Sequence, residues 1–218
     1  MSDESLFREV DEEVRQEQFQ KLWARYGNLI MAVCFAVVAG VAGFKGWQYW
    51  QVKQAEAAGE AFFAAEKLAA TGKADEAAKQ FQTISHAGYG VLARLREANV
   101  LVGQGKSADA AKLYDVIAAD ASADGALRDL ARIRAALAVA DTATPADLMG
   151  RLKTFDAAGN PWRHVAREAM AAALWRSQDY AGADKQVQAI LADGQAPVGV
   201  LQRARVLSDL LAPLLAQK

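Results

Sequence analysis

Residues 72–79 read GKADEAAK and residues 105–112 read GKSADAAK, so one pattern occurs twice in this part of the chain. The distance from Gly72 to Gly105 is a period in the thirties, which is typical of stacked pairs of helices. The glycine suits the end of a first helix, where a tight or left-handed backbone is needed, and the alanines suit a close crossing of two helices. A third copy begins at Tyr180 and ends at Ile190. The pattern therefore predicts that each copy opens the second helix of a pair.

A different pattern marks the first helix of each pair. It reads LARLR at residues 92–96, LARIR at 130–134, VAR at 165–167 and LQRAR at 201–205, so its starts recur with a similar period. A single helix pair cannot bury its apolar side alone, so the copies must stack on one another. Both patterns together predict an all-α fold, a tetratricopeptide-like right-handed α-solenoid.

The composition of the chain agrees with this fold. Of 218 residues, 53% are apolar, 23% are charged and only 4 are proline, a balance typical of a globular, helical chain. No run of β-branched residues alternates with polar ones, so we expect no strand. The expected helix pairs are residues 54–70 with 74–86, 89–102 with 108–119, 125–140 with 145–157 and 162–177 with 180–192, and residues 198–215 close the array as a cap.

An uncharged stretch precedes the repeats. Residues 26–44, YGNLIMAVCFAVVAGVAGF, span 19 positions, which at about 1.5 Å each approach the ~30 Å of a hydrocarbon core. Aromatic side chains bracket it, as at the two interfaces of a spanning helix. A buried helix of a soluble protein and a cleaved signal peptide are the alternatives. We expect a transmembrane helix at residues 26–44, with residues 1–25 before it, an interfacial linker at 45–53 and the repeat domain at 54–218.

The basic residues around the span predict its orientation. Residues 1–25 hold four Lys or Arg, whereas only Lys45 and Lys53 lie close on the other side. The positive-inside bias therefore places residues 1–25 in the cytoplasm and the repeats outside. Apolar residues recur at helical spacing before the span, which favours a cytoplasmic amphipathic helix that rests on the bilayer surface. These residues are Phe7, Val10, Val14, Phe19, Leu22, Trp23 and Tyr26.

Small residues form a ridge within the span. Ala32, Ala36 and Gly40 are spaced four apart, so they lie on one side of the helix. Such a ridge lets a second transmembrane helix approach closely, and packing is what drives association in lipid. Alanine and glycine are also common in membrane helices that do not pair, so both interpretations stay open.

The residues that could carry chemistry are few. His86 and His164 are the only histidines, and the one cysteine, Cys34, lies in the span. His164 and Glu168 share one side of a helix, where a solvated ion pair is a better interpretation than a metal site. A net charge of −1 lacks the basic footprint that nucleic acid requires. We therefore expect no catalysis, cofactor, metal, nucleic acid or small-molecule substrate.

A solenoid of this kind exposes a concave surface lined by the first helices of its pairs, and such surfaces bind proteins. An exposed tryptophan in a groove is a common binding hot spot, so Trp175 is the sharpest candidate, although it could also pack between layers as core. The residues predicted to line the groove are Leu95, Asn99, Val102, Glu168, Trp175 and Arg176.

The arginines of the repeated pattern have two interpretations. Arg94, Arg132, Arg167 and Arg203 could form a ladder for acidic partners. Local pairing is favoured, because Asp129 precedes Arg132 by three positions and Asp209 follows Arg205 by four, both within reach on a helix.

The chain also resembles a known family. The residues that carry the likeness are GWQYW at 46–50, YGVLAR at 89–94 and LAR at 130–132. They resemble the YfgM family of bacterial inner-membrane proteins. The resemblance implies an ancillary subunit of the SecYEG translocon, with a cytoplasmic N-terminus and a periplasmic repeat domain. Implied partners are translocon subunits, periplasmic chaperones such as the isomerase PpiD, and unfolded clients. The alternative hypothesis is a self-assembling scaffold for envelope or cell-division complexes.

Overall fold

The computed structural model describes the backbone of residues 3–216, and the side chains within that range except those of residues 3–14 and 16–19. All regular structure in this part of the chain is helical, with nine α-helices and one short 3-10 helix, so the all-α prediction is confirmed. The chain divides into two compact units, Met1–Glu56 and Ala57–Lys218. Of the predicted amphipathic set, Phe7, Val10, Val14 and Phe19 lie outside the described side chains, whereas Leu22, Trp23 and Tyr26 are exposed.

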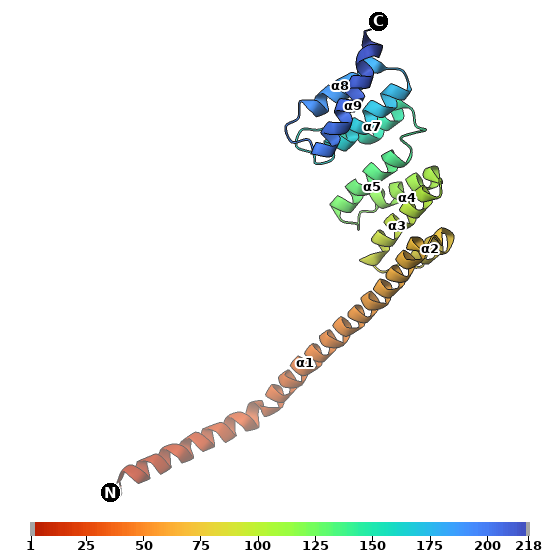
Figure 1. The fold of residues 1–218 in the computed structure, drawn as a ribbon. Coiled ribbons are helices and arrows are strands. Elements are labelled where there is room, and N and C mark those ends of the chain that lie inside the picture. The colour runs from red at the N-terminus through yellow and green to blue at the C-terminus, as the bar shows by residue number, and fades with distance from the viewer. Residues whose placement is uncertain (1–2, 217–218) are drawn as a thin grey trace. The chain divides into compact units, whose positions relative to one another are not determined.

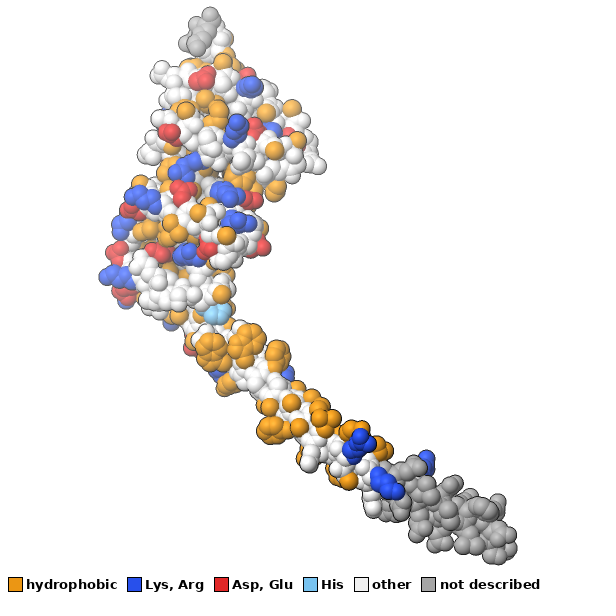
Figure 2. Space-filling model, turned by 180° about the vertical axis from the view of Figure 1, so that it is seen from behind, with side chains coloured by type: hydrophobic (Ala, Val, Ile, Leu, Met, Phe, Trp, Pro, Cys, Tyr) orange, Lys and Arg blue, Asp and Glu red, His pale blue; other side chains and the backbone are white. Residues whose placement is uncertain are grey.

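The first unit consists of helix α1, Asp3–Ala70, as far as Glu56. Within the described residues, Gln20–Ala70 is one helix long and apolar enough to cross a membrane by length and composition. Figure 2 shows hydrophobic side chains along the described part of this helix, whereas acidic and basic side chains are mixed over the visible face of the second unit. The linker expected at residues 45–53 is helical and continuous with both neighbours, because no proline interrupts it.

The second unit begins with the end of α1 and continues as a chain of helices (Figure 1). Each helix packs on the next one in sequence from α2 to α9, and α9 also contacts α7. The helices are α2 (Ala74–Gln82), α3 (Tyr89–Gly103), α4 (Ser107–Ala119), α5 (Gly125–Ala138), α6 (Pro145–Leu152), the 3-10 helix η1 (Lys153–Phe155), α7 (Arg163–Arg176), α8 (Tyr180–Leu191) and α9 (Val198–Leu215). These bounds confirm the predicted order of helix pairs. The first helix of the first pair is the end of the much longer α1, and α2 and α6 are shorter than expected.

The turns between paired helices share one backbone device. Gly72, Gly105 and Gln178 adopt positive φ angles of 80°, 76° and 66° at the ends of α1, α3 and α7. In each turn the next residue donates its N–H to a leucine carbonyl five positions earlier, which satisfies the last helical carbonyls. The third copy therefore makes the same turn without a glycine.

The core divides into clusters between successive helices. Ala110, from the repeated pattern, is fully buried, as predicted for an alanine at a helix crossing. Three further alanines are fully buried in the same way: Ala98, Ala171 and Ala183. Larger side chains, including Tyr114 and Ile117, fill the space beside them. No backbone polar group needs a partner across these crossings, because each helix satisfies its own interior.

The fourth copy of the arginine pattern is not equivalent to the other three. The second position of the pattern is a fully buried alanine in α3, α5 and α7, at Ala93, Ala131 and Ala166. In α9 this position is the exposed Gln202, whereas Ala204 and Leu211 face the core. α9 therefore presents a different side to the stack than the sequence alignment predicts.

Candidate protein-binding surface

A hollow of about 380 Å³ opens between α3, α4 and α5, and we call it the α3–α5 hollow. Its apolar rim includes Val102, which is 40% exposed, and Leu137, which is 39% exposed. The residues that line it are Asn99, Val102, Gly103, Tyr114, Arg134, Leu137 and Ala138.

The buried side chain of Tyr114 forms the floor of the α3–α5 hollow and is hydrogen-bonded to the side-chain amide of Asn99. The Tyr114 hydroxyl donates to Asn99 Oδ1 at 2.6 Å. Burial raises the pKa of the Tyr114 hydroxyl, and the nearby Arg134 guanidinium acts in the opposite direction. This bond fixes the orientation of the Asn99 amide, whose Nδ2 group has two donors for a ligand in the hollow. Arg134 is exposed and adds further donors, so the polar groups of the hollow suit a ligand rich in acceptors, such as a polypeptide backbone.

The structure brings together two of the six residues predicted to line a groove. Asn99 and Val102 meet in the α3–α5 hollow. Leu95 lies on the same stripe of α3 but is only 7% exposed and belongs to the core, because α4 covers it. It is therefore not a surface contact. Sequence reasoning missed Tyr114, Arg134, Leu137 and Ala138, which come from α4 and α5.

The other three predicted residues lie on α7 and have partners within the chain. Glu168 pairs with Arg203 of α9, with Arg203 Nη2 at 2.8 Å from Glu168 Oε2. Trp175 is half-buried and packs its ring edge-on to Tyr180 at 5.8 Å. Arg176 donates to the carbonyl oxygens of Ala140 and Ala143, just beyond the end of α5. These contacts join α7 to its neighbours, and the binding role of all three stays a prediction.

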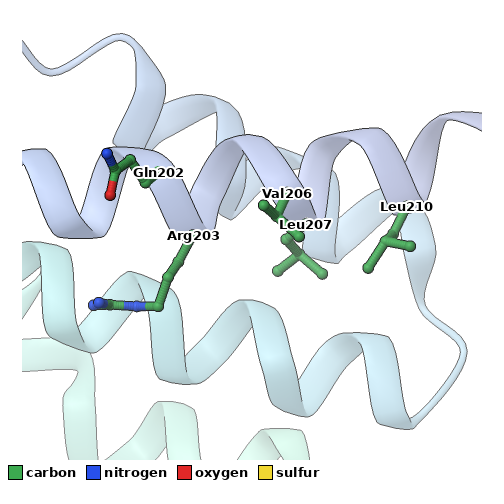
Figure 3. Close-up of a pocket in the computed structure, with 5 residues that line it drawn as sticks. All are labelled: Gln202, Arg203, Val206, Leu207 and Leu210. Carbon is green, nitrogen blue, oxygen red and sulfur yellow. The ribbon is translucent and has the colours of Figure 1, made fainter.

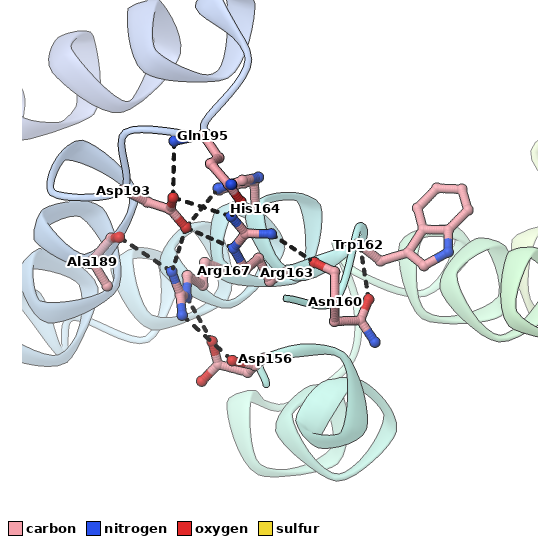
Figure 4. Close-up of polar contacts among 9 residues, drawn as sticks. All are labelled: Asp156, Asn160, Trp162, Arg163, His164, Arg167, Ala189, Asp193 and Gln195. Atoms are coloured by element: carbon pink, nitrogen blue, oxygen red, sulfur yellow. Dashed lines mark hydrogen bonds and ion pairs between the residues drawn. The ribbon is translucent and has the colours of Figure 1, made fainter. Parts of the chain in front are cut away.

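A buried polar cluster fixes the start of α7 (Figure 4). Arg163 donates to Asp193 at 2.6 Å, and His164 Nε2 lies 3.0 Å from the same carboxylate. The bond from Arg163 and the backbone N–H of Gln195 hold the pKa of Asp193 well below its usual range. The expected solvated pair of His164 with Glu168 is wrong, because His164 is buried against Asp193.

The same aspartate contact occurs in an earlier repeat. Arg94 Nη2 lies 2.8 Å from Asp120, just after α4, and Arg167 Nη1 lies 3.8 Å from Asp193, just after α8. Each aspartate also accepts a bond from a backbone N–H two positions on, at Ser122 and Gln195. Bonds from the hydroxyl of Ser122 and from Arg94 lower the pKa of Asp120 to about 2. These aspartates tie the end of a second helix to the first helix of its own pair.

The arginines of the repeated pattern are thus engaged rather than free. Arg132 pairs with Asp129 at 2.7 Å, which confirms that local prediction. Arg205 and Asp209 are exposed, and neither forms an ion pair or hydrogen bond within the described residues, so the second predicted pair is absent there. A free arginine ladder for acidic partners is accordingly not present at Arg94, Arg132, Arg167 and Arg203.

The small residues of the span have open surroundings in the first unit. Ala32, Ala36 and Gly40 are exposed, and a Cβ atom added at Gly40 would meet nothing within 4 Å. Close approach of another helix is therefore sterically possible along this ridge, but no contact within the described chain tests it. Among the described residues, no group of three His, Cys, Asp or Glu side chains could hold a metal ion.

Comparison with known proteins identifies one family. The model of a family described as a tetratricopeptide repeat-like domain matches residues 20–159. The matched segment starts in the apolar part of α1 and extends past the 3-10 helix η1. Neither the curated proteins nor the solved structures yield a match.

Proposed function

Since the chain belongs to the family of proteins with a tetratricopeptide repeat-like domain, we propose that it is a protein-binding adaptor anchored in a membrane by α1. More specifically, we propose an ancillary subunit of the bacterial SecYEG translocon. In this role the N-terminus lies in the cytoplasm, and the second unit binds periplasmic chaperones or emerging secreted clients. The observation that carries the proposal is the joining of one apolar, exposed helix to a stack of helix pairs.

The exposed surface of α1 supports the membrane part of the proposal. Its large apolar side chains between residues 29 and 44 are exposed along the helix, where water would leave them unfavourably solvated. A hydrocarbon environment removes that cost, and a helix satisfies all of its interior backbone groups there. The basic residues that precede the span support the cytoplasmic side for the N-terminus.

The α3–α5 hollow supports the binding part of the proposal. Exposed apolar side chains beside fixed hydrogen-bond donors are what a protein interface combines at its centre. Val102 and Leu137 supply apolar surface, and Asn99 is held in place by Tyr114. A segment of a partner could bury the aliphatic rim while its backbone carbonyls accept bonds from Asn99 and Arg134.

We propose no catalytic role for the chain. His164 and Asp193 lie close together, but the carboxylate is engaged by Arg163 and a backbone N–H, and the histidine is buried. A general acid or base must reach a substrate proton, and the buried side of this cluster offers no such access. The cluster is better explained as the tie between α7 and the loop after α8.

Site-specific photocrosslinking in native membranes tests the binding proposal. A photoreactive amino acid at Val102 is compared with one at Val116, which is 55% exposed and lies on α4. We expect Val102 to capture translocon subunits or periplasmic chaperones several times more strongly than Val116 does, because Val102 borders the hollow. Equal capture at both positions would refute the assignment of the hollow, and capture of copies of the same chain alone would refute the adaptor role.

A further inference from the structure

The last helix of the stack, α9, carries an apolar stripe that nothing in the described chain covers. Val198, Val206 and Leu210 form the stripe, with the polar Gln202 between them at the same spacing of four, and all four residues are exposed. Val206 is 61% exposed and Leu210 is 54% exposed. The opposite side of α9 packs on the core through Val200, Ala204 and Leu211. α9 is therefore apolar on two sides, and one of them faces solvent.

The stripe has the shape of a socket for another helix. A hollow of about 300 Å³ is lined by Arg203, Val206, Leu207 and Leu210, together with Gln202 (Figure 3). The first four residues stand at positions i, i+3, i+4 and i+7, which is the arrangement that receives one side chain of a facing helix in knobs-into-holes packing. The occupant that fits this hollow is an aliphatic side chain at the edge of a facing helix.

The charges beside the stripe indicate which helix that is. Arg205 and Asp209 are four positions apart, so they lie on the same side of the stripe about 6 Å apart along the axis. Neither has an ion pair or hydrogen bond in the described part of the chain. A second helix with the same arginine and aspartate, placed antiparallel to the first, would therefore set each positive group beside a negative one.

We propose that α9 pairs antiparallel with α9 of a second copy of this chain, about a two-fold axis between residues 207 and 208. This axis brings Arg205 of each copy to within one residue of the level of Asp209 of the other, about 1.5 Å along the helix, so the long arginine side chains can form two equivalent ion pairs. It also sets Val206 of each copy within one residue of the level of Leu210 of the other, so the two stripes face one another. A two-fold interface uses one surface patch twice, and this patch is complementary to itself.

The pairing is weak in solution and depends on the membrane. α9 has 18 residues and is about 27 Å long, so one helix pair buries less surface than a standard interface of about 1,600 Å². Two chains anchored in one membrane meet at a high effective concentration, which populates a weak contact without any new interaction. The dimer should therefore form with increasing density of chains in a bilayer.

Energy transfer between labelled full-length chains in phosphatidylcholine–phosphatidylglycerol vesicles tests the pairing. Cys34→Ala removes the native thiol, and Lys185→Cys on the exposed side of α8 carries the donor or acceptor dye. We expect Arg205→Asp alone and Asp209→Arg alone each to raise the protein density needed for half-maximal transfer at least about tenfold, since each variant places like charges opposite one another.

Mixing the two variants gives the decisive comparison. Donor-labelled Arg205→Asp with acceptor-labelled Asp209→Arg should restore the transfer, because every contact between unlike chains is again attractive. If Arg205 and Asp209 acted only through an ion pair within one chain, mixing the two variants would not restore the energy transfer. Transfer that stays at the level of either variant alone overturns the proposal.

The apolar contact has its own matched control. Val206→Lys should abolish the dimer, whereas Val116→Lys, a similarly exposed position on α4, should leave it unchanged. Equal behaviour of these two variants overturns the proposal, as would transfer through the span that ignores every change in α9. The vesicles contain no other protein, so the outcome is independent of the adaptor function. A photoreactive residue at Val206 that captures a different protein in native membranes, and never this chain, would assign the stripe to that partner instead.

Discussion

Substitution by alanine at two glycines near the end of α3 should change the free energy of unfolding in opposite directions. Gly103 is the last residue of the helix, and Gly105 adopts a φ of 76° in the turn that follows. A Cβ atom added at either position would meet nothing within 4 Å, so neither change creates a clash. Only the backbone conformation differs between the two sites.

The magnitudes follow from that difference. Alanine in the left-handed conformation costs about 1–2 kcal/mol, so Gly105→Ala should lower the free energy of unfolding by that amount. Gly103→Ala should raise it by about 0.5 kcal/mol, because alanine loses less conformational freedom than glycine in a helix. The two variants should therefore differ by about 1.5–2.5 kcal/mol.

Urea unfolding of residues 57–218, followed by circular dichroism, measures both variants against the parent. The unfolding midpoint should shift down for Gly105→Ala and up for Gly103→Ala, with the slope unchanged. Shifts of the same sign would refute the assignment of the left-handed turn and, with it, the account of how each pair of helices is joined.

Three further predictions concern the contacts between helices. Gln178→Gly should raise the free energy of unfolding by about 0.5–1 kcal/mol in the same urea assay, because it relieves a left-handed glutamine. Arg176→Ala should lower it by about 1–2 kcal/mol through loss of two carbonyl bonds beyond α5, whereas Arg205→Ala, which has no partner in the described residues, should change it by less than about 0.5 kcal/mol. The pKa of Asp120 in the folded chain is about 2, below the ordinary value of 3.8. The stabilisation that the ionised carboxylate gives to the folded chain is therefore present above pH 4 and is lost as the pH falls toward 2. Asp120→Asn should therefore flatten the pH dependence of the urea midpoint between pH 4 and 2 relative to the parent.

The positions of the helices could be predicted from the sequence because the same turn pattern recurs in successive repeats. Gly72 and Gly105 end their helices as the pattern indicated, and the repeated alanines Ala77 and Ala110 are buried. The same reasoning did not reveal that Gln178 takes the glycine position, since a non-glycine residue hides a left-handed turn from any search for glycines. The conformation of this turn is set by the packing of α7 on α8, and that packing cannot be predicted from the residues of the turn alone.

The binding surface was predicted only in part. The spacing places Leu95, Asn99 and Val102 on one stripe of α3, but it does not show where along that stripe the neighbouring helix stops covering it. Arg134 and Leu137 lie on α5, and their meeting with Asn99 depends on how adjacent pairs stack. The aspartate contacts of Asp120 and Asp193 were missed for a related reason, because each partner lies on the preceding helix, far from its aspartate in the sequence.

The pattern at residues 201–205 resembles the three earlier copies in sequence, but its buried positions differ from theirs for a physical reason. Within the described residues no helix pair follows α9 to bury its second side, so its core positions need not match those of the interior copies. Gln202 is exposed where Ala93, Ala131 and Ala166 are buried, and the stripe through Val206 faces solvent as a result.

Protease accessibility tests most directly whether α1 holds the second unit on the far side of the membrane. Bacterial cells with a permeabilised outer membrane and an intact inner membrane are treated with protease, and the chain is detected through a tag after Lys218. We expect the tagged second unit to be digested, while a fragment that contains residues 1–25 stays protected, because the proposal places these residues in the cytoplasm. A tagged chain that stays intact until the inner membrane is lysed would contradict it.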